Sequence, residues 1–171
     1  MSTDIKWRCC IVFSAGDKIV YPMHGAGIIC GIEERKILGQ KKEYYIFKLP
    51  CSEINIMIPV DSEATVGIRP VADRAVISDA INLLQAESTE MDGNWNRRYR
   101  DNMEKLKSGD IMQVAEVVRN LMRMEIKKNL SSGEKKLLDS GKQILISEIM
   151  LAADMTWREA EEMIKKAVGH C

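Results

Sequence analysis

The chain has 171 residues, of which 25 are basic and 25 acidic, so its formal net charge is zero. Hydrophobic residues make up 46% and charged residues 29%, which is typical of a soluble globular protein. No apolar run approaches the ~20 residues that a membrane-spanning helix needs. These values exclude a helical membrane protein and leave room for one large domain or two small ones.

The cysteines and the first residues bear on the compartment. There are five cysteines, an odd number, and none stands in a CxxC pair. The first dozen residues hold no apolar segment followed by a small-residue cleavage site, so we expect no secretion signal. Reduced thiols in a cytoplasmic protein are the simplest interpretation. Residues 1–12 are predicted to be an extension of uncertain order.

Short β-type runs with turn residues between them begin at Phe13. Alternating or β-branched runs occupy residues 17–21, 28–32, 35–38, 43–49 and 54–58. Five short strands in about 55 residues predict a small, strongly bent sheet or barrel over residues 13–70. Such a sheet has edge strands, which can pair with a strand of a partner protein.

The hydrophobic period changes from two to 3.6 at about Pro70. Helices are predicted over residues 72–85, 95–107 and 111–128, with two more starting near residues 131 and 156. Capping-box patterns mark the last two starts, Ser131 with Glu134 and Thr156 with Glu159. Five helices with short connections predict a compact helical domain over residues 71–169.

Charge is sorted along this helical part. Residues 119–136 carry six bases and two acids, whereas residues 148–162 carry five acids and one base. A protein with zero net charge can therefore still present a basic face to nucleic acid.

The stretch from Asn94 to Lys107 combines an aromatic ring with cations. Asn94 is a good N-cap residue, which would place Trp95 at the first helical position. Five bases and two acids lie between residues 94 and 107. An exposed indole among cations at a helix start suits a phosphate backbone beside an open base step. Local sequence alone favours the alternative, in which Trp95 fills the helical core and the arginines are only solvated, because most tryptophans are largely buried.

Signatures of catalysis are missing from the sequence. There are two histidines, and we find no phosphate-binding glycine loop, HExxH, GxSxG or metal-ligand spacing. Cys30 or Cys51 with His24 could form a nucleophile–base pair, which leaves a thiol-dependent enzyme as one alternative. Both cysteines lie in apolar runs, so we expect buried, inert thiols and a turn at His24. The sequence argues against an enzyme, and we expect no metal or cofactor.

Four blocks of sequence resemble one known family. Residues 16–25, Gly-Asp-Lys-Ile-Val-Tyr-Pro-Met-His-Gly, resemble the opening signature of the CarD/CdnL family of bacterial transcription regulators. Residues 94–99, 108–121 and 131–138 resemble blocks of its helical half, in the same order. The resemblance runs from about Phe13 to Val168.

The resemblance implies a two-domain α+β protein and a partner for each domain. The N-terminal domain would be a Tudor-like β-barrel of about five strands that docks on the β subunit of RNA polymerase, like the corresponding domain of transcription-repair coupling factors. Arg35, Ile37 and Met57 would belong to that docking surface. Met57 stands where relatives have a second arginine, so one charge-assisted contact is missing.

The same resemblance implies that the five-helix domain contacts promoter DNA at the upstream edge of the transcription bubble. Trp95 matches a tryptophan that wedges into the minor groove there. The positions that face DNA in relatives correspond to Arg97, Arg98, Arg100 and Lys135. The protein would act as a monomer on polymerase in the bacterial cytoplasm, without ATP. A polymerase-binding adaptor that does not touch DNA is the other alternative.

Overall fold

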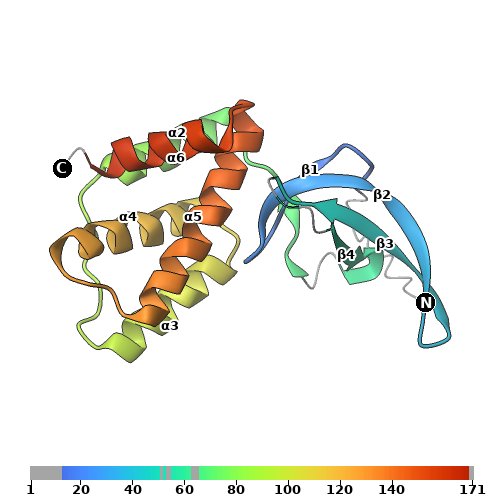
Figure 1. Ribbon diagram of the computed structural model, residues 1–171, viewed down its shortest axis with the longest axis horizontal. Helices are drawn as coiled ribbons and strands as arrows, with labels where there is room; N and C mark the ends of the chain where they lie inside the picture. The colour runs from blue at the N-terminus through green and yellow to red at the C-terminus, as the bar shows by residue number, and fades with distance from the viewer. Residues whose placement is uncertain (1–12, 51, 53–54, 63–65, 170–171) are drawn as a thin grey trace, which may run out of the picture.

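The computed structural model describes residues 13–50, 52, 55–62 and 66–169. An antiparallel sheet is followed in the chain by five helices, which confirms the predicted two-domain α+β fold (Figure 1). The extension expected over residues 1–12 lies outside the described residues.

The sheet has five strands, and each pairs antiparallel with its neighbour in the order β4-β3-β2-β1-β5. Their bounds are Lys18–Tyr21 for β1, Gly25–Ile37 for β2, Gln40–Lys48 for β3, Asn55–Pro59 for β4 and Arg69–Pro70 for β5. One face is closed by a small core of buried side chains, namely Phe13, Ile19, Ile29, Tyr45, Phe47 and Ile58. Within the described residues no β4–β5 pairing closes the sheet, so β4 and β5 are its edges.

The strands are divided differently from the prediction. The runs at residues 28–32 and 35–38 form a single 13-residue strand, β2, with a register shift between Ile29 and Gly31. Past the end of β4, β2 and β3 continue as a two-stranded ribbon (Figure 1). Such a ribbon is solvated on both faces, which explains why a charged stretch remains a strand without alternation. The two-residue strand β5 was not predicted, because so short a strand has no period to detect.

The five helices begin close to the predicted residues. Their bounds are Arg74–Gln85 for α2, Trp95–Lys107 for α3, Ile111–Lys127 for α4, Ser132–Ala153 for α5 and Trp157–Val168 for α6. Both capping boxes are confirmed, at Ser131 for α5 and at Thr156 for α6. Helix α2 starts two residues later than predicted, because the Asp73 side chain caps it by accepting from the Val76 N–H.

The apolar stripes of the helices pack into one core. It includes Ala80, Leu84, Leu106, Val114, Val118, Leu121, Leu138, Leu145, Ile149 and Ile164, all almost fully buried. Val76 on α2 is 36% exposed and lies at the margin of this core. Trp157 is partly buried against this core.

The sheet meets the helices where β1 and the start of β2 face helix α5. The Ala26 N–H donates to Ser147 Oγ at 2.9 Å. Lys18 Nζ donates to the Leu151 carbonyl at 2.8 Å and pairs with Asp154 at 2.9 Å. Val20, Ala26 and Leu151 form a small apolar cluster between the two domains. The domains are therefore packed against each other as well as joined by the chain.

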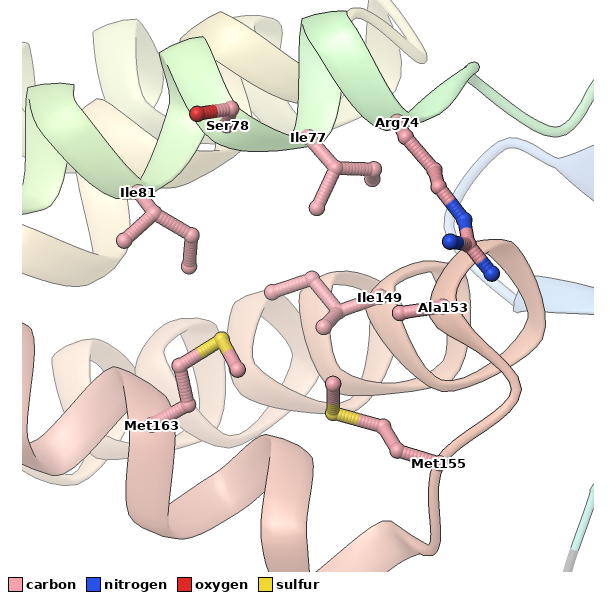
Figure 2. Close-up of a pocket in the computed structure, with 8 residues that line it drawn as sticks. All are labelled: Arg74, Ile77, Ser78, Ile81, Ile149, Ala153, Met155 and Met163. Atoms are coloured by element: carbon pink, nitrogen blue, oxygen red, sulfur yellow. The ribbon is translucent and has the colours of Figure 1, made fainter.

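A pocket of about 340 Å³ lies between α2, α5 and α6 (Figure 2). Its walls are apolar side chains, namely Ile77, Ile81, Ile149, Ala153, Met155 and Met163, with Arg74 and Ser78 as the polar lining. No two side chains of this lining could act together as a general acid and a general base.

Gly25 offers a test of the close packing between the domains. Its φ is +106°, and a Cβ added there would lie 2.7 Å from Ser147 Oγ. Gly16 has a similar φ of +96° but nothing within 4 Å of its Cβ position. Gly25→Ala should therefore lower the free energy of unfolding by about 1–3 kcal/mol more than Gly16→Ala does. Urea unfolding of both variants measures this, and equal losses would show that the contact with α5 is loose.

Candidate nucleic-acid interface

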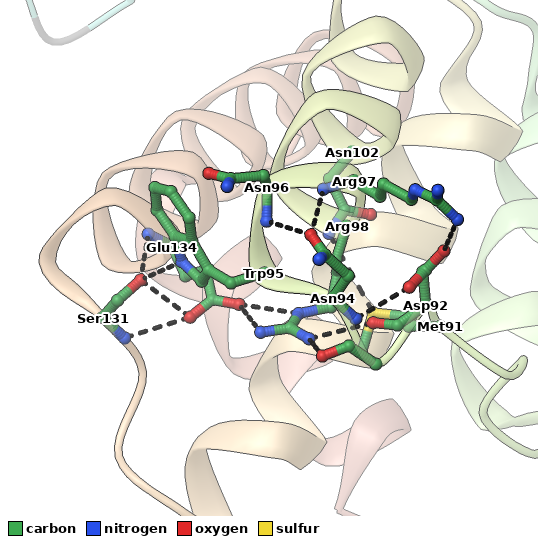
Figure 3. Close-up of polar contacts among 11 residues, drawn as sticks. Met91, Asp92, Asn94, Trp95, Asn96, Arg97, Arg98, Asn102, Ser131 and Glu134 are labelled. Carbon is green, nitrogen blue, oxygen red and sulfur yellow. Dashed lines mark hydrogen bonds and ion pairs between the residues drawn. The ribbon is translucent and has the colours of Figure 1, made fainter.

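The start of α3 is fixed by side-chain hydrogen bonds. Asn94 caps the helix as predicted, since its side-chain oxygen accepts from the N–H groups of Asn96 at 3.0 Å and Arg97 at 3.2 Å. The Asn94 N–H in turn donates to Asp92 Oδ1 at 2.7 Å. Trp95 is therefore the first helical residue, on a backbone that is anchored on both sides (Figure 3).

Trp95 lies at the surface. It is 44% exposed, so it does not fill the helical core. Its Nε1 donates to Ser131 Oγ at 2.8 Å, and its ring stacks on Tyr99 at 5.4 Å between centroids and 25° between planes. Both rings pass close to Gly133, where a Cβ would approach Tyr99 to 3.2 Å. The indole is thus a rigid, half-exposed apolar plate held between the starts of α3 and α5.

Arg98 requires a correction. It was expected to face DNA, but it is only 7% exposed and its guanidinium faces Glu134. Nε and Nη2 donate to Glu134 Oε1 at 2.8 and 2.7 Å, and Nη1 donates to the Asp92 carbonyl at 2.9 Å. A guanidinium with these partners cannot also reach a phosphate without leaving its site. Arg98 belongs to the support of the surface rather than to the surface itself.

Glu134 completes that support. It closes the capping box of α5 and accepts hydrogen bonds from Ser131 and Arg98. Burial by itself would raise the pKa of Glu134. The hydrogen bonds from Ser131 and Arg98, together with the Arg98 charge, outweigh burial and hold the pKa below its ordinary value of 4.5. The ion pair therefore stabilises the fold above about pH 4.5, and this stabilisation is lost as the pH falls through the lowered pKa.

The other predicted DNA-facing cations are exposed. Arg97 is at the surface, with a 3.9 Å approach to Asp92, and Arg100 lies one turn after Asn96 on α3. Lys135 is exposed in the first turn of α5, four residues after the hydroxyl that binds the Trp95 indole. The Trp95–Ser131 hydrogen bond joins the starts of α3 and α5, and both helices carry exposed cations near these starts.

The excess of bases in residues 119–136 does not produce a correspondingly basic surface. Arg119 and Arg123 are buried, and they donate to backbone carbonyls at the end of α2, including those of Leu83, Leu84 and Ala86. Among the acids of residues 148–162, Glu148 is fully buried. Counting charges along the chain thus overestimated the basic face, because local sequence does not show which long side chains turn inward.

A second surface lies on the sheet. Pairing places Arg35 opposite Lys42, Ile37 opposite Gln40, and Met57 opposite Ile46, which itself pairs with Gly31. Residues directly opposite share a face, and so do alternate residues of one strand. Arg35, Ile37 and Met57 therefore share the outer face of the sheet, away from its core. Ile37 is 44% and Met57 48% exposed, and Arg35 forms an ion pair with Glu33.

The thiol-dependent alternative gains no support. Cys30 is exposed, contrary to our expectation of a buried thiol, because it falls on the solvent-facing side of β2. His24 lies in a turn, as predicted, and its ring contacts Tyr21 with centroids 4.4 Å apart. Cys51 lies outside the described residues. Within the described residues no group of three or more His, Cys, Asp or Glu side chains could hold a metal ion.

Comparison with known proteins agrees with this two-part construction. Residues 13–72 match the family model described as "CarD-like/TRCF RID domain", and residues 79–165 match "CarD, C-terminal domain". The chain belongs to the CarD family of transcription regulators.

The chain is also 40% identical over 148 residues to a Bacillus subtilis (strain 168) protein named "Putative transcription factor YdeB". The aligned part covers 86% of this chain and 97% of that protein. In the part of the chain that the structure describes, none of the helices has both the length and the apolarity to cross a bilayer.

The role of Arg98 can be tested against its exposed neighbour. Arg98→Ala leaves the buried Glu134 carboxylate without its partner, so it should lower the free energy of unfolding by about 3–5 kcal/mol. Arg100→Ala removes the same side chain from the solvent-exposed face of the same helix and should change stability by less than about 0.5 kcal/mol. Chemical denaturation of both variants at pH 7 provides the measurement. Equal losses in the free energy of unfolding would show that Arg98 is a surface cation like Arg100.

Proposed function

We propose that this protein stabilises the promoter open complex while bound to RNA polymerase. In this proposal Trp95 inserts into the minor groove at the upstream edge of the bubble. The outer face of the sheet, with Arg35, Ile37 and Met57, docks on the β subunit. The observation that carries the proposal is the half-exposed Trp95, held rigidly at the start of a helix that also carries exposed cations.

The cost of insertion favours this place on DNA. Base steps at the edge of a melted region are already partly unstacked, so an inserted side chain has less stacking to disrupt than in intact duplex. On the protein side, the Tyr99 stack and the Ser131 hydrogen bond restrict the rotation of the Trp95 ring. Little side-chain entropy is then lost on binding, and this preorganisation favours the complex.

Contacts to phosphates follow from the exposed cations. Arg97 and Arg100 on α3 and Lys135 on α5 are exposed near the two helix starts that meet at Trp95, and they can pair with the DNA backbone around the opened step. The first-turn N–H groups of α3 add a favourable partial charge, although two of them are already bound by Asn94. Contacts of this kind do not read base sequence, and they weaken as salt concentration rises.

The sheet supplies affinity for polymerase. Its outer face combines exposed apolar side chains with Arg35, and β4 is an edge strand to which a partner strand can be added. Met57 contributes apolar area but no charge, so docking relies on Arg35 for charge-assisted contacts. The protein acts as a monomer on polymerase in the cytoplasm and uses no ATP. A ligand that binds the open complex better than the closed one shifts the equilibrium toward open.

Trp95→Ala tests the wedge directly. The variant should lose most of the increase in open-complex lifetime, yet lower the free energy of unfolding by less than about 1.5 kcal/mol, because the ring is half exposed. Trp157→Ala is the matched control, since Trp157 starts α6 but packs against the helical core. Trp157→Ala should lower the free energy of unfolding by more than Trp95→Ala does. Under conditions in which the variant is folded, it should still lengthen the lifetime of the open complex. If Trp95→Ala retains the full effect, the protein acts without a wedge, as an adaptor would.

Arg35→Glu tests the docking face. Charge reversal should weaken polymerase binding and leave the affinity of the protein for forked DNA unchanged. Lys36→Glu makes the same charge change at the next residue of β2, whose side chain points to the opposite face of the ribbon. Polymerase binding measured at moderate salt should separate the two variants. Equal loss for both would indicate a general charge effect and place the docking face elsewhere.

A further inference from the structure

A buried ion pair joins the last strand of the sheet to helix α5. The side chain of Glu148 on α5 is fully buried. Arg69 on β5 meets it with a two-pronged contact, Nη1 to Oε1 at 2.6 Å and Nη2 to Oε2 at 2.8 Å. The partners stand 79 residues apart in the chain.

The same two side chains bind two further segments of the chain. Arg69 Nε donates to the Gly109 carbonyl in the α3–α4 connection at 2.7 Å. Glu148 Oε1 also accepts from the Ala72 N–H, just before α2, at 2.9 Å. One ion pair thus ties together the end of the sheet, the connection to the helices, the end of α3 and the last third of α5.

The β1–β2 turn reinforces this junction. Pro22 lies against Gly109, whose φ is +72° and whose Cβ position is 3.2 Å from Pro22 Cγ. Met23 packs against the helical core. Gly109 therefore carries two contacts from the sheet domain, the Pro22 ring and the Arg69 hydrogen bond, at the residue that separates α3 from α4.

Energy alone gives little reason for such a pair. Moving two charges out of water costs about as much as their attraction returns, so a buried ion pair is a poor source of net stability compared with apolar packing. The pair instead restricts orientation. A guanidinium that binds a carboxylate through two parallel hydrogen bonds allows only a narrow range of angles between the two groups.

We propose that Arg69 and Glu148 are positioning residues, which set the orientation of the Trp95 surface relative to the docking face of the sheet. This role rests on the proposed function. Docking on polymerase makes the DNA contact intramolecular, and its effective concentration is highest when the geometry needs no search. A loosened junction leaves both binding surfaces intact but spreads Trp95 over many positions.

The test replaces the pair without leaving a lone buried charge. In Arg69→Met/Glu148→Gln, methionine retains the aliphatic stem, and the glutamine oxygen can still accept from the Ala72 N–H. Binding to polymerase alone and to forked DNA alone should stay within about twofold of wild type, as should folding judged by thermal melting. The concentration needed to lengthen open-complex lifetime should rise at least about tenfold.

Two further variants complete the experiment. Arg158→Met/Glu162→Gln removes an exposed Arg–Glu pair on α6, away from the junction, and should leave the lifetime effect unchanged. Arg69→Lys retains the buried charge but not the two-pronged contact. Arg69→Lys should also raise the concentration needed to lengthen open-complex lifetime, but by a smaller factor. If the double variant does not fold, the result for Arg69→Lys tests the positioning role in its place.

The outcomes separate the inference from the proposed function. If wild-type protein lengthens lifetime and the folded Arg69→Met/Glu148→Gln variant does so at the same concentration, the positioning role is wrong while the function stands. The same holds for Arg69→Lys if it has to replace the double variant. If wild-type protein has no effect on lifetime, the proposed function fails and the positioning role fails with it. A parallel loss of polymerase or forked-DNA binding would also overturn the inference, because it would show damage to a binding surface.

Discussion

The buried contact between Arg69 and Glu148 is the constraint on which the arrangement of this molecule depends. Without it, the domains would still touch through Lys18, Ala26 and Pro22, but no buried two-pronged contact would fix the angle between them. With it, the edge strand β5, the connection to α2 and the last third of α5 share one set of hydrogen bonds. A second buried ion pair, Arg98 with Glu134, fixes the orientation of the start of α3 in the same way that the first fixes the orientation of the domains. Both pairs orient groups that would otherwise rotate.

The four sequence blocks that carry the family resemblance gather at these two places. Residues 16–25 supply the β1–β2 turn, whose Pro22 meets Gly109 of the block at 108–121. Residues 94–99 and 131–138 meet through the Trp95–Ser131 hydrogen bond and the Arg98–Glu134 ion pair. Segments far apart in the chain thus build one junction and one aromatic surface.

How far the sequence predicted this structure depends on the range of the interactions involved. Caps at Asn94, Ser131 and Thr156 were predicted because a cap is read from residues within one turn. The exposed position of Trp95 required the family resemblance, since local sequence favoured a buried ring. The Arg98 prediction was wrong because its partner lies 36 residues away. The capping box showed that Glu134 would sit at a helix start, but not that α3 would use its carboxylate.

Rigid separation of two binding surfaces is the central claim, and a distance measurement tests it most directly. Spin labels at Lys36 on the ribbon and Asn96 on α3, both exposed, report on the two domains once the native cysteines have been replaced. We predict one narrow distance distribution in the free protein, and the same distribution in the open promoter complex with polymerase. A broad distribution in the free protein that narrows or shifts on binding would contradict the account. It would show that polymerase and DNA, rather than the junction, set the position of Trp95.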